Sequence, residues 1–176
     1  MRRVGTTRPA AAIGVIIWLC SASAPAAELG DAQIEIHYAP AENLEAIDRE
    51  LIDSAGETID MAAYVLTDWT VIDALVDAAE RGVRVRIWRD RSATEHTNAD
   101  ELARLTATEG VELRVKHSSD LMHLKSYVVD GQILRTGAAN FSASGEKRQD
   151  NDLVVIRDPA LAARFEANFE RLWSGR

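Results

Sequence analysis

The segment from Leu121 to Ile156 reads LMHLKSYVVDGQILRTGAANFSASGEKRQDNDLVVI. Two strand-like runs in it, His123–Asp130 and Gln132–Thr136, meet at the dipeptide Asp130-Gly131. Asp-Gly between two such runs is a strong signal for a tight β-hairpin, because both residue types tolerate a positive φ. A third apolar run, Leu153–Ile156, predicts another strand. We therefore expect this segment to supply a large part of a β-sheet.

Upstream of this segment, strand-like and helix-like patterns alternate along the chain. Thr58–Leu66 is a continuous apolar run that suits a buried strand, and Val83–Trp88 alternates as a strand with one polar face does. The other expected elements are strands Gln33–Tyr38 and Val111–Val115 and helices Asn43–Ala55, Trp69–Arg81, Asn98–Ala107 and Ala160–Trp173. The pattern predicts an α/β fold: a single domain with one mixed, mostly parallel sheet and helices on both faces.

The first 26 residues are organised like a secretory signal. Three arginines precede an apolar run, Ala10–Cys20, that is too short to span a bilayer comfortably. Ala24-Pro25-Ala26 then matches a cleavage site. We predict a bacterial signal peptide over residues 1–26 and a mature domain over 27–176, in the periplasm or secreted, with no stable membrane insertion after cleavage. An uncleaved N-terminal anchor is the alternative.

The charge balance restricts how a polyanion could bind. The chain has 20 Lys and Arg against 28 Asp and Glu, a net charge of −8, and cleavage would remove three arginines and no acids. Proteins that grip nucleic acid over a long footprint are usually basic, so such a substrate must meet a local positive patch. The only cysteine, Cys20, lies in the predicted signal, so the mature domain is expected to have no disulfide.

His123 and Lys125 form the group most suited to chemistry. They are two residues apart on the expected strand, so both side chains should leave the same face of the sheet. An ammonium can neutralise the non-bridging oxygens of a phosphodiester, and a neutral imidazole can attack its phosphorus. Asp130 is an odd number of residues away and opens the hairpin, so we interpret it as a structural residue facing the other way.

His123, Lys125 and Asp130 together form the pattern H-x-K-x-x-x-x-D, and Gly137-Ala138-Ala139-Asn140 follows it. This arrangement resembles the signature of the phospholipase D superfamily, and most of all the small bacterial endonucleases with one such motif per chain. The resemblance implies the phospholipase D/nuclease fold, with these three residues as the catalytic motif. It also implies a phosphodiesterase that hydrolyses P–O bonds through a phosphohistidine.

The resemblance further implies that Asn140, Asn151 and Asp152 bind the substrate phosphate or orient the histidine. Two residues depart from the family pattern. Ala138 stands where a serine is usual, which removes a hydrogen bond worth about 1 kcal/mol. Asn151 stands where glutamate is frequent, with Asp150 and Asp152 beside it, so any of these three residues could be the group that orients the imidazole.

A phosphohistidine route needs an acid for the leaving oxygen. A second histidine suits this role, because an unperturbed imidazole has a pKa of about 6.5. In the family that the chain resembles, single-motif members form dimers. We therefore predict an isologous homodimer sharing one active site, in which one His123 attacks and the other donates a proton. The sequence has no zinc-binding spacing of histidines or cysteines, and we expect neither a metal nor another cofactor.

Several alternatives remain open from the sequence. DNA or RNA is the favoured substrate because of the small single-motif architecture, whereas the acidic surface favours phospholipid. A third possibility is a non-catalytic phosphate- or nucleic-acid-binding module that lost activity through the two departures. Asp150 and Asp152 could bind a hard cation or simply form hydrogen bonds, and Arg84 and Arg86 could face the substrate or pair with acidic neighbours.

Overall fold

The computed structural model describes residues 32–92, 99–118 and 120–175. The strands are β1 Gln33–Ala39, β2 Thr58–Ala63, β3 Arg84–Arg89, β4 Val111–Val115, β5 Lys125–Val129, β6 Ile133–Gly137 and β7 Asn151–Arg157. The helices are α1 Leu44–Asp53, α2 Trp69–Glu80, α3 Ala99–Ala107, α4 Ala143–Lys147 and α5 Pro159–Trp173. All the predicted elements are present. The structure also contains α4, which the sequence did not predict because five residues are too few to show a helical period. The predicted signal peptide lies outside the described residues.

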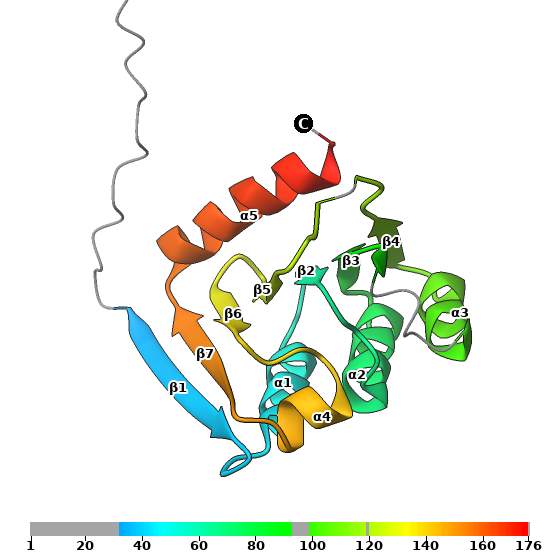
Figure 1. Ribbon diagram of the computed structural model, residues 1–176. Coiled ribbons are helices and arrows are strands. Elements are labelled where there is room, and N and C mark those ends of the chain that lie inside the picture. Colours follow the sequence, from blue (N-terminus) through cyan, green and yellow to red (C-terminus); the bar gives the residue numbers. More distant parts are fainter. Residues whose placement is uncertain (1–31, 93–98, 119, 176) are drawn as a thin grey trace, which may run out of the picture.

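The strands form one seven-stranded sheet in the order β1-β7-β6-β5-β2-β3-β4 (Figure 1). The expected mixed α/β sheet in a single domain is confirmed, but the expectation of mostly parallel pairing is wrong. Only β2–β3 and β3–β4 are parallel, and the other four pairings are antiparallel. The reason is connection length: parallel neighbours need a crossover helix, as α2 and α3 provide, whereas a tight turn joins β5 to β6. In that turn Asp130 and Gly131 have φ values of 51° and 63°.

The two faces of the sheet are covered unequally. Helices α1, α2 and α4 lie on one face and α5 alone on the other (Figure 1). The main core lies on the first face, where alternate residues of β2 such as Ile59 and Met61 belong to the same cluster as Leu75 of α2. On the second face, Phe169 and Trp173 of α5 cluster with Ala62. None of the helices in the described part of the chain has the length and apolarity needed to span a bilayer.

Buried charges on the second face are paired. The Arg86 guanidinium donates to both carboxylate oxygens of Asp60, at 2.7 and 2.6 Å, and to Glu170 of α5 at 2.6 Å. Arg86 is therefore a partner of acidic neighbours, and the alternative that it faces a substrate is excluded.

One edge of the sheet collects most of the predicted site residues. Strands β5 and β7 run opposite to the other five, so their first residues meet the last residues of β2 and β6. Lys125 begins β5, Gly137 ends β6 and Asn151 begins β7. Asp130, at the far end of β5, lies at the opposite edge.

Candidate active site

His123 lies just before β5 and not within it, which corrects the prediction that the strand begins there. The last backbone pairing between β2 and β5 joins Ala63 to Lys125, and beyond it the Tyr64 N–H donates to the Leu124 carbonyl at 2.8 Å. The Lys125 Nζ donates to the His123 carbonyl at 2.9 Å. Strand alternation is therefore not what brings the two residues together. The lysine side chain bends back toward the histidine backbone.

Tyr64 contacts both residues, and sequence reasoning missed it. Its ring centroid is 4.5 Å from that of the His123 imidazole, with the planes inclined by 59°, and 5.0 Å from the Lys125 Nζ. Tyr64 lies in the apolar run Thr58–Leu66, and in such a run an aromatic residue indicates only a strand. A tyrosine at the carboxyl end of a central strand, where α/β proteins place their sites, is the signal that could have found it.

Exposure differs between the histidine and the lysine. His123 is exposed, whereas Lys125 is only 7% exposed. Burial lowers the pKa of Lys125 below its ordinary value, because the ammonium loses hydration. A phosphodiester placed against it would supply the missing negative charge. The site thus combines an accessible imidazole, His123, with a buried ammonium, Lys125, that has no acidic partner among the described residues.

The loop after β6 is shaped by Gly137 and Asp152. Gly137 has a φ of 145°, and a Cβ there would lie 2.5 Å from the Asp152 carbonyl oxygen, so only glycine fits. The Ala138 N–H donates to Asp152 Oδ1 at 3.1 Å. Asn140 is half-buried, and its Oδ1 has no hydrogen-bond partner within the described residues. The Asp152 carboxylate thus holds, through the hydrogen bond from the Ala138 N–H, the loop that carries Asn140.

Asn151 is directed toward α4. Its Nδ2 donates to the Gly145 carbonyl at 2.9 Å and to Gln149 Oε1 at 3.3 Å. Within the three described ranges, neither Asn151 nor Asp152 hydrogen-bonds to the His123 imidazole. The structure therefore gives these two residues loop-holding contacts in place of the expected orienting contact.

A buried arginine connects both parts of the site. Arg135 of β6 forms a bidentate pair with Asp48 of α1, at 2.9 and 2.7 Å, and both side chains are fully buried. Its Nη1 donates to the carbonyls of Lys125, at 2.9 Å, and Ala139, at 3.3 Å. Arg135 therefore fixes the start of β5 relative to the loop of Asn140. The sequence signal was an arginine in the middle of an apolar strand.

Glu146 of α4 completes this cluster. It is fully buried, and its Oε1 lies 3.4 Å from Arg135 Nη2. Burial, reinforced by the negative charge of Asp48 and opposed in part by Arg135, raises the pKa of Glu146 to about 10. At neutral pH Glu146 is therefore a neutral carboxyl group beside the Arg135–Asp48 pair.

Asp130 has a structural role, as its position in the hairpin predicted. Its carboxylate accepts hydrogen bonds from the backbone N–H groups of Gly56, at 2.9 Å, and of Glu57 and Thr58, each at 2.8 Å. These contacts attach the β5–β6 turn to the start of β2. Asp130 is thus remote from His123 and serves the fold.

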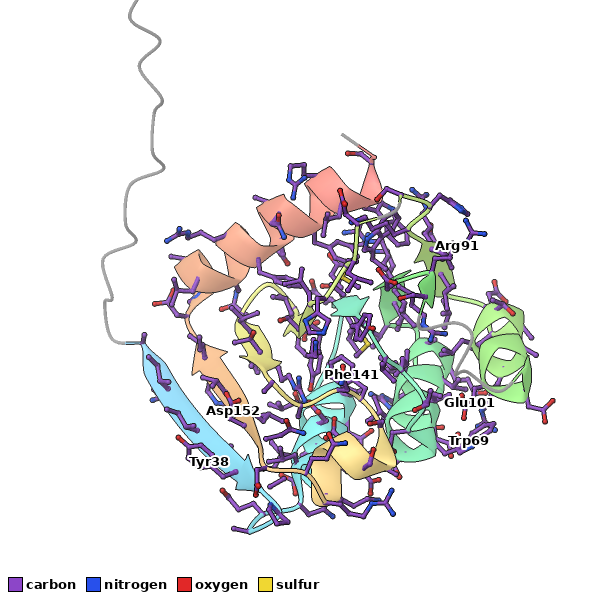
Figure 2. All side chains as sticks on the ribbon, in the orientation of Figure 1. Tyr38, Trp69, Arg91, Glu101, Phe141 and Asp152 are labelled. Atoms are coloured by element: carbon purple, nitrogen blue, oxygen red, sulfur yellow. The ribbon has the colours of Figure 1, made fainter. Side chains whose placement is uncertain are left out.

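Two hollows lie near the site. A groove of about 510 Å³ is lined by Ile36, Tyr38 and Val154 together with Asn151 and Asp152. Figure 2 labels Tyr38 on β1 and Asp152 on β7, which pair directly across the two strands.

The second hollow, of about 440 Å³, follows the carboxyl end of β4. Lys116, His117 and Arg171 line it, together with the Trp88 indole, and no acidic side chain of the described residues does. It is a cationic pocket on an acidic protein, at the start of the segment that leads from β4 to His123.

No three His, Cys, Asp or Glu side chains in the described part of the chain are grouped so as to hold a metal ion. Asp152 accepts a hydrogen bond from the Ala138 N–H. This contact supports the alternative that Asp152 forms hydrogen bonds, over the alternative that it binds a hard cation.

Comparison with known proteins places the chain in a family. The family model described as "Cardiolipin synthase, PLD-like domain" matches residues 49–173. A phospholipase D of Rickettsia bellii is 30% identical over 81% of this chain and 70% of its own length. A mitochondrial cardiolipin hydrolase of Chlamydomonas reinhardtii is 27% identical over 70% of this chain, which spans only 55% of that protein.

The fold has close counterparts among solved structures. Nuc of Salmonella typhimurium, a phospholipase D family member, superposes with a TM-score of 0.73 at 30% identity, covering 81% of this chain and 95% of Nuc. NucT of Helicobacter pylori also gives 0.73, at 20% identity, covering 81% of this chain and 96% of NucT. The chain therefore belongs to the phospholipase D superfamily, as a single phospholipase D-like domain of the phosphodiesterase type.

Proposed function

We propose that the protein is a nucleic-acid endonuclease that cleaves phosphodiester P–O bonds through a phosphohistidine on His123. The observation that carries the chemistry is the grouping of an exposed imidazole and a buried ammonium, Lys125, at one edge of the sheet. The likeness to Nuc over nearly its whole length supports this reading, because Nuc is also a small single-domain member of the family.

The reaction proceeds in two displacements. An imidazole nitrogen of His123 attacks phosphorus, a P–N bond forms, and the P–O bond to the leaving group breaks. Lys125 neutralises the non-bridging oxygens, and the Asn140 amide hydrogen-bonds to the same phosphate. An acid protonates the leaving oxygen. Water then attacks phosphorus while the same group, now deprotonated, takes the water's proton; the P–N bond breaks, and the free imidazole is restored.

The acid is His123 of a second copy of this chain, in an isologous dimer. An apolar row on β1 supports this assembly: Ile34, Ile36 and Tyr38 are 49%, 53% and 57% exposed. Two of them, Ile36 and Tyr38, line the groove that reaches Asn151 and Asp152. A partner that covers this row would also lie close to the active edge.

The cationic pocket favours nucleic acid as the substrate. Lys116, His117 and Arg171 gather around an indole, which suits a phosphate-bearing chain with planar bases. The pocket lies at the same sheet edge as His123, because β4 runs parallel to β2. A polymer bound at His123 could therefore continue into it.

Phospholipid is the second candidate, and a specific observation favours it. Leu121 and Leu124 flank His123 and are 57% and 36% exposed. Apolar side chains beside the nucleophile would suit the acyl region of a lipid. The relatives named phospholipase D and cardiolipin hydrolase are consistent with this alternative.

The test is to incubate the purified protein in EDTA with plasmid DNA, RNA, and phosphatidylcholine or cardiolipin vesicles. We expect cleavage of nucleic acid without added metal. Cleavage of the vesicles alone would contradict the nuclease proposal and favour phospholipid as the substrate. Loss of all activity in EDTA would contradict the metal-free mechanism.

His123→Asn separates an enzyme from a non-catalytic binding module. We expect activity to fall by about 10⁴-fold or more with folding retained, since the nucleophile is lost. His37→Asn is the matched control, because His37 pairs with acidic surface residues, Glu42 at 2.8 Å and Glu35 at 3.8 Å, away from the His123 site. Equal activity of both variants would place the active site elsewhere.

Export is a further part of the proposal. It rests on the arginines, the apolar run and the Ala24-Pro25-Ala26 site of the first 26 residues. N-terminal sequencing of the protein from each cell fraction should find a chain that begins near Ala27, in the periplasm or the medium. A chain that still begins at Met1 in the membrane fraction would favour the uncleaved anchor.

A further inference from the structure

We propose that Tyr64 is a positioning residue whose ring holds the His123 imidazole in its attacking orientation. The inference rests on the proposed phosphohistidine chemistry. Tyr64 would act through His123 and would not touch the substrate itself.

The first observation is that Tyr64 contacts both reacting groups. The imidazole lies 4.5 Å from its ring centroid, and the Lys125 ammonium lies 5.0 Å from the same centroid. A cation near an aromatic ring is attracted by the ring's quadrupole. One ring thus fixes where the nucleophile and the cation stand relative to each other.

The second observation is that no hydrogen bond to another described residue restrains the imidazole. Among the described residues it accepts and donates no hydrogen bond, and Asn151 is engaged with the Gly145 carbonyl and Gln149. An exposed histidine with no hydrogen bond samples several rotamers, and only some of them aim a nitrogen at phosphorus. The tyrosine ring is therefore a contact, among the described residues, that can limit its rotation.

The third observation is that Tyr64 is itself firmly placed. Its N–H donates to the Leu124 carbonyl at 2.8 Å, which joins it to the segment that carries His123. On its other side, the Thr67 and Asp68 N–H groups donate to the Phe141 carbonyl at 2.8 and 3.0 Å, next to Asn140. The backbone around Tyr64 is thus bound to both parts of the site, and its side chain is half-buried. A ring held in this way can restrict the rotation of the His123 imidazole that packs against it.

The experiment compares Tyr64→Leu with Tyr64→Phe on a small chromogenic diester, bis(p-nitrophenyl) phosphate, and on plasmid DNA. Leucine keeps apolar volume but removes the ring, and phenylalanine removes only the hydroxyl. We expect kcat of Tyr64→Leu to fall about 10- to 100-fold with KM within about threefold, as for a misplaced nucleophile. Tyr64→Phe should retain most of the wild-type kcat.

Tyr64→Phe is the rescue arm, because it restores the ring without the hydroxyl. A loss in Tyr64→Leu that appears in kcat and not in KM, and that phenylalanine restores, indicates positioning of the nucleophile. Thermal unfolding of every variant, expected within a few degrees of wild type, checks the fold.

The outcomes separate this inference from the proposed function. If the wild-type protein hydrolyses no diester, the proposed function fails. If the wild type is active and Tyr64→Leu keeps its kcat, or Tyr64→Phe loses as much as Tyr64→Leu, the positioning role of the ring is overturned.

Discussion

Asp130 and His123 belong to one sequence motif yet lie at opposite edges of the sheet. Burial alone would raise the pKa of the Asp130 carboxyl, but the backbone N–H groups of Thr58, Gly56 and Glu57 outweigh it and lower the pKa below its ordinary value. Stability from such a group is present above the unfolded pKa of about 3.9 and is lost as pH falls through the lower folded pKa.

Asp130→Ala should therefore destabilise the fold without impairing chemistry. We expect the free energy of unfolding at pH 7 to fall by about 1.5–3 kcal/mol, since the backbone N–H groups of Gly56, Glu57 and Thr58 lose a charged acceptor. The deficit relative to wild type should shrink below pH 4. Urea titration at both pH values, with kcat per folded molecule, measures this, and a large loss of kcat in fully folded protein would show a catalytic role.

Lys125 presents the opposite case, a residue that serves chemistry at the expense of stability. Its folded pKa lies below the ordinary 10.5, so the folded chain holds the proton less tightly than the unfolded chain. The charged lysine therefore costs stability at neutral pH, and the cost disappears as pH rises through the folded pKa toward 10.5.

Lys125→Met should lose activity but not stability. We expect kcat to fall about 100-fold or more, while the free energy of unfolding at pH 7 equals or exceeds that of wild type. Lys147→Met is the control, because Lys147 pairs with Glu45 on the surface. The prediction fails if Lys125→Met unfolds at clearly lower urea concentration than wild type.

At the scale of elements, α1, α4, β5 and β6 meet in one buried charge cluster. Asp48 and Arg135 pair there, and Glu146 lies beside them with a pKa raised to about 10. A carboxyl group with a raised pKa contributes stability that is fully present below its unfolded pKa and is lost as pH rises toward the folded value. Between about pH 4.5 and 10, this group should make the wild-type protein less stable as pH increases.

Glu146→Gln should remove that pH dependence. The amide has nearly the shape of the protonated acid and does not ionise, so we expect the variant to be more stable than wild type at pH 9. The difference should be smaller at pH 5. Urea unfolding at the two pH values measures it, and identical pH profiles for both proteins would contradict a neutral Glu146.

At the scale of the whole molecule, the proposed cleft needs two copies of the chain. Equal amounts of wild-type and His123→Asn protein are mixed and given time to exchange subunits. We expect about a quarter of the activity of the same total amount of wild-type protein, because random pairing makes one dimer in four fully wild type. Independent sites would leave about half. Size-exclusion chromatography with light scattering provides the check, since an active monomer would rule out the shared cleft.

Local sequence patterns predicted the order of elements well, and particular residues show why. Asp130-Gly131 specified the hairpin, because the turn requires two positive φ values in adjacent residues. Alternating and helical periodicities reflect which side of a single element is buried, so they can be read without knowing its neighbours. The same locality explains the boundary errors at His123 and Leu66, since strands end where a partner stops pairing, and that partner is distant in sequence.

The amino-acid sequence by itself determined the α/β class, the hairpin and the histidine–lysine pair that marks the superfamily, because each is written in residues close together along the chain. Only the tertiary structure decided that most strands pair antiparallel, that Tyr64 stands against His123, that Arg135 joins both halves of the site, and that Asn151 turns toward α4. These contacts join segments far apart in sequence. Their partners depend on strand order and on which buried polar groups find each other, and no local pattern encodes either.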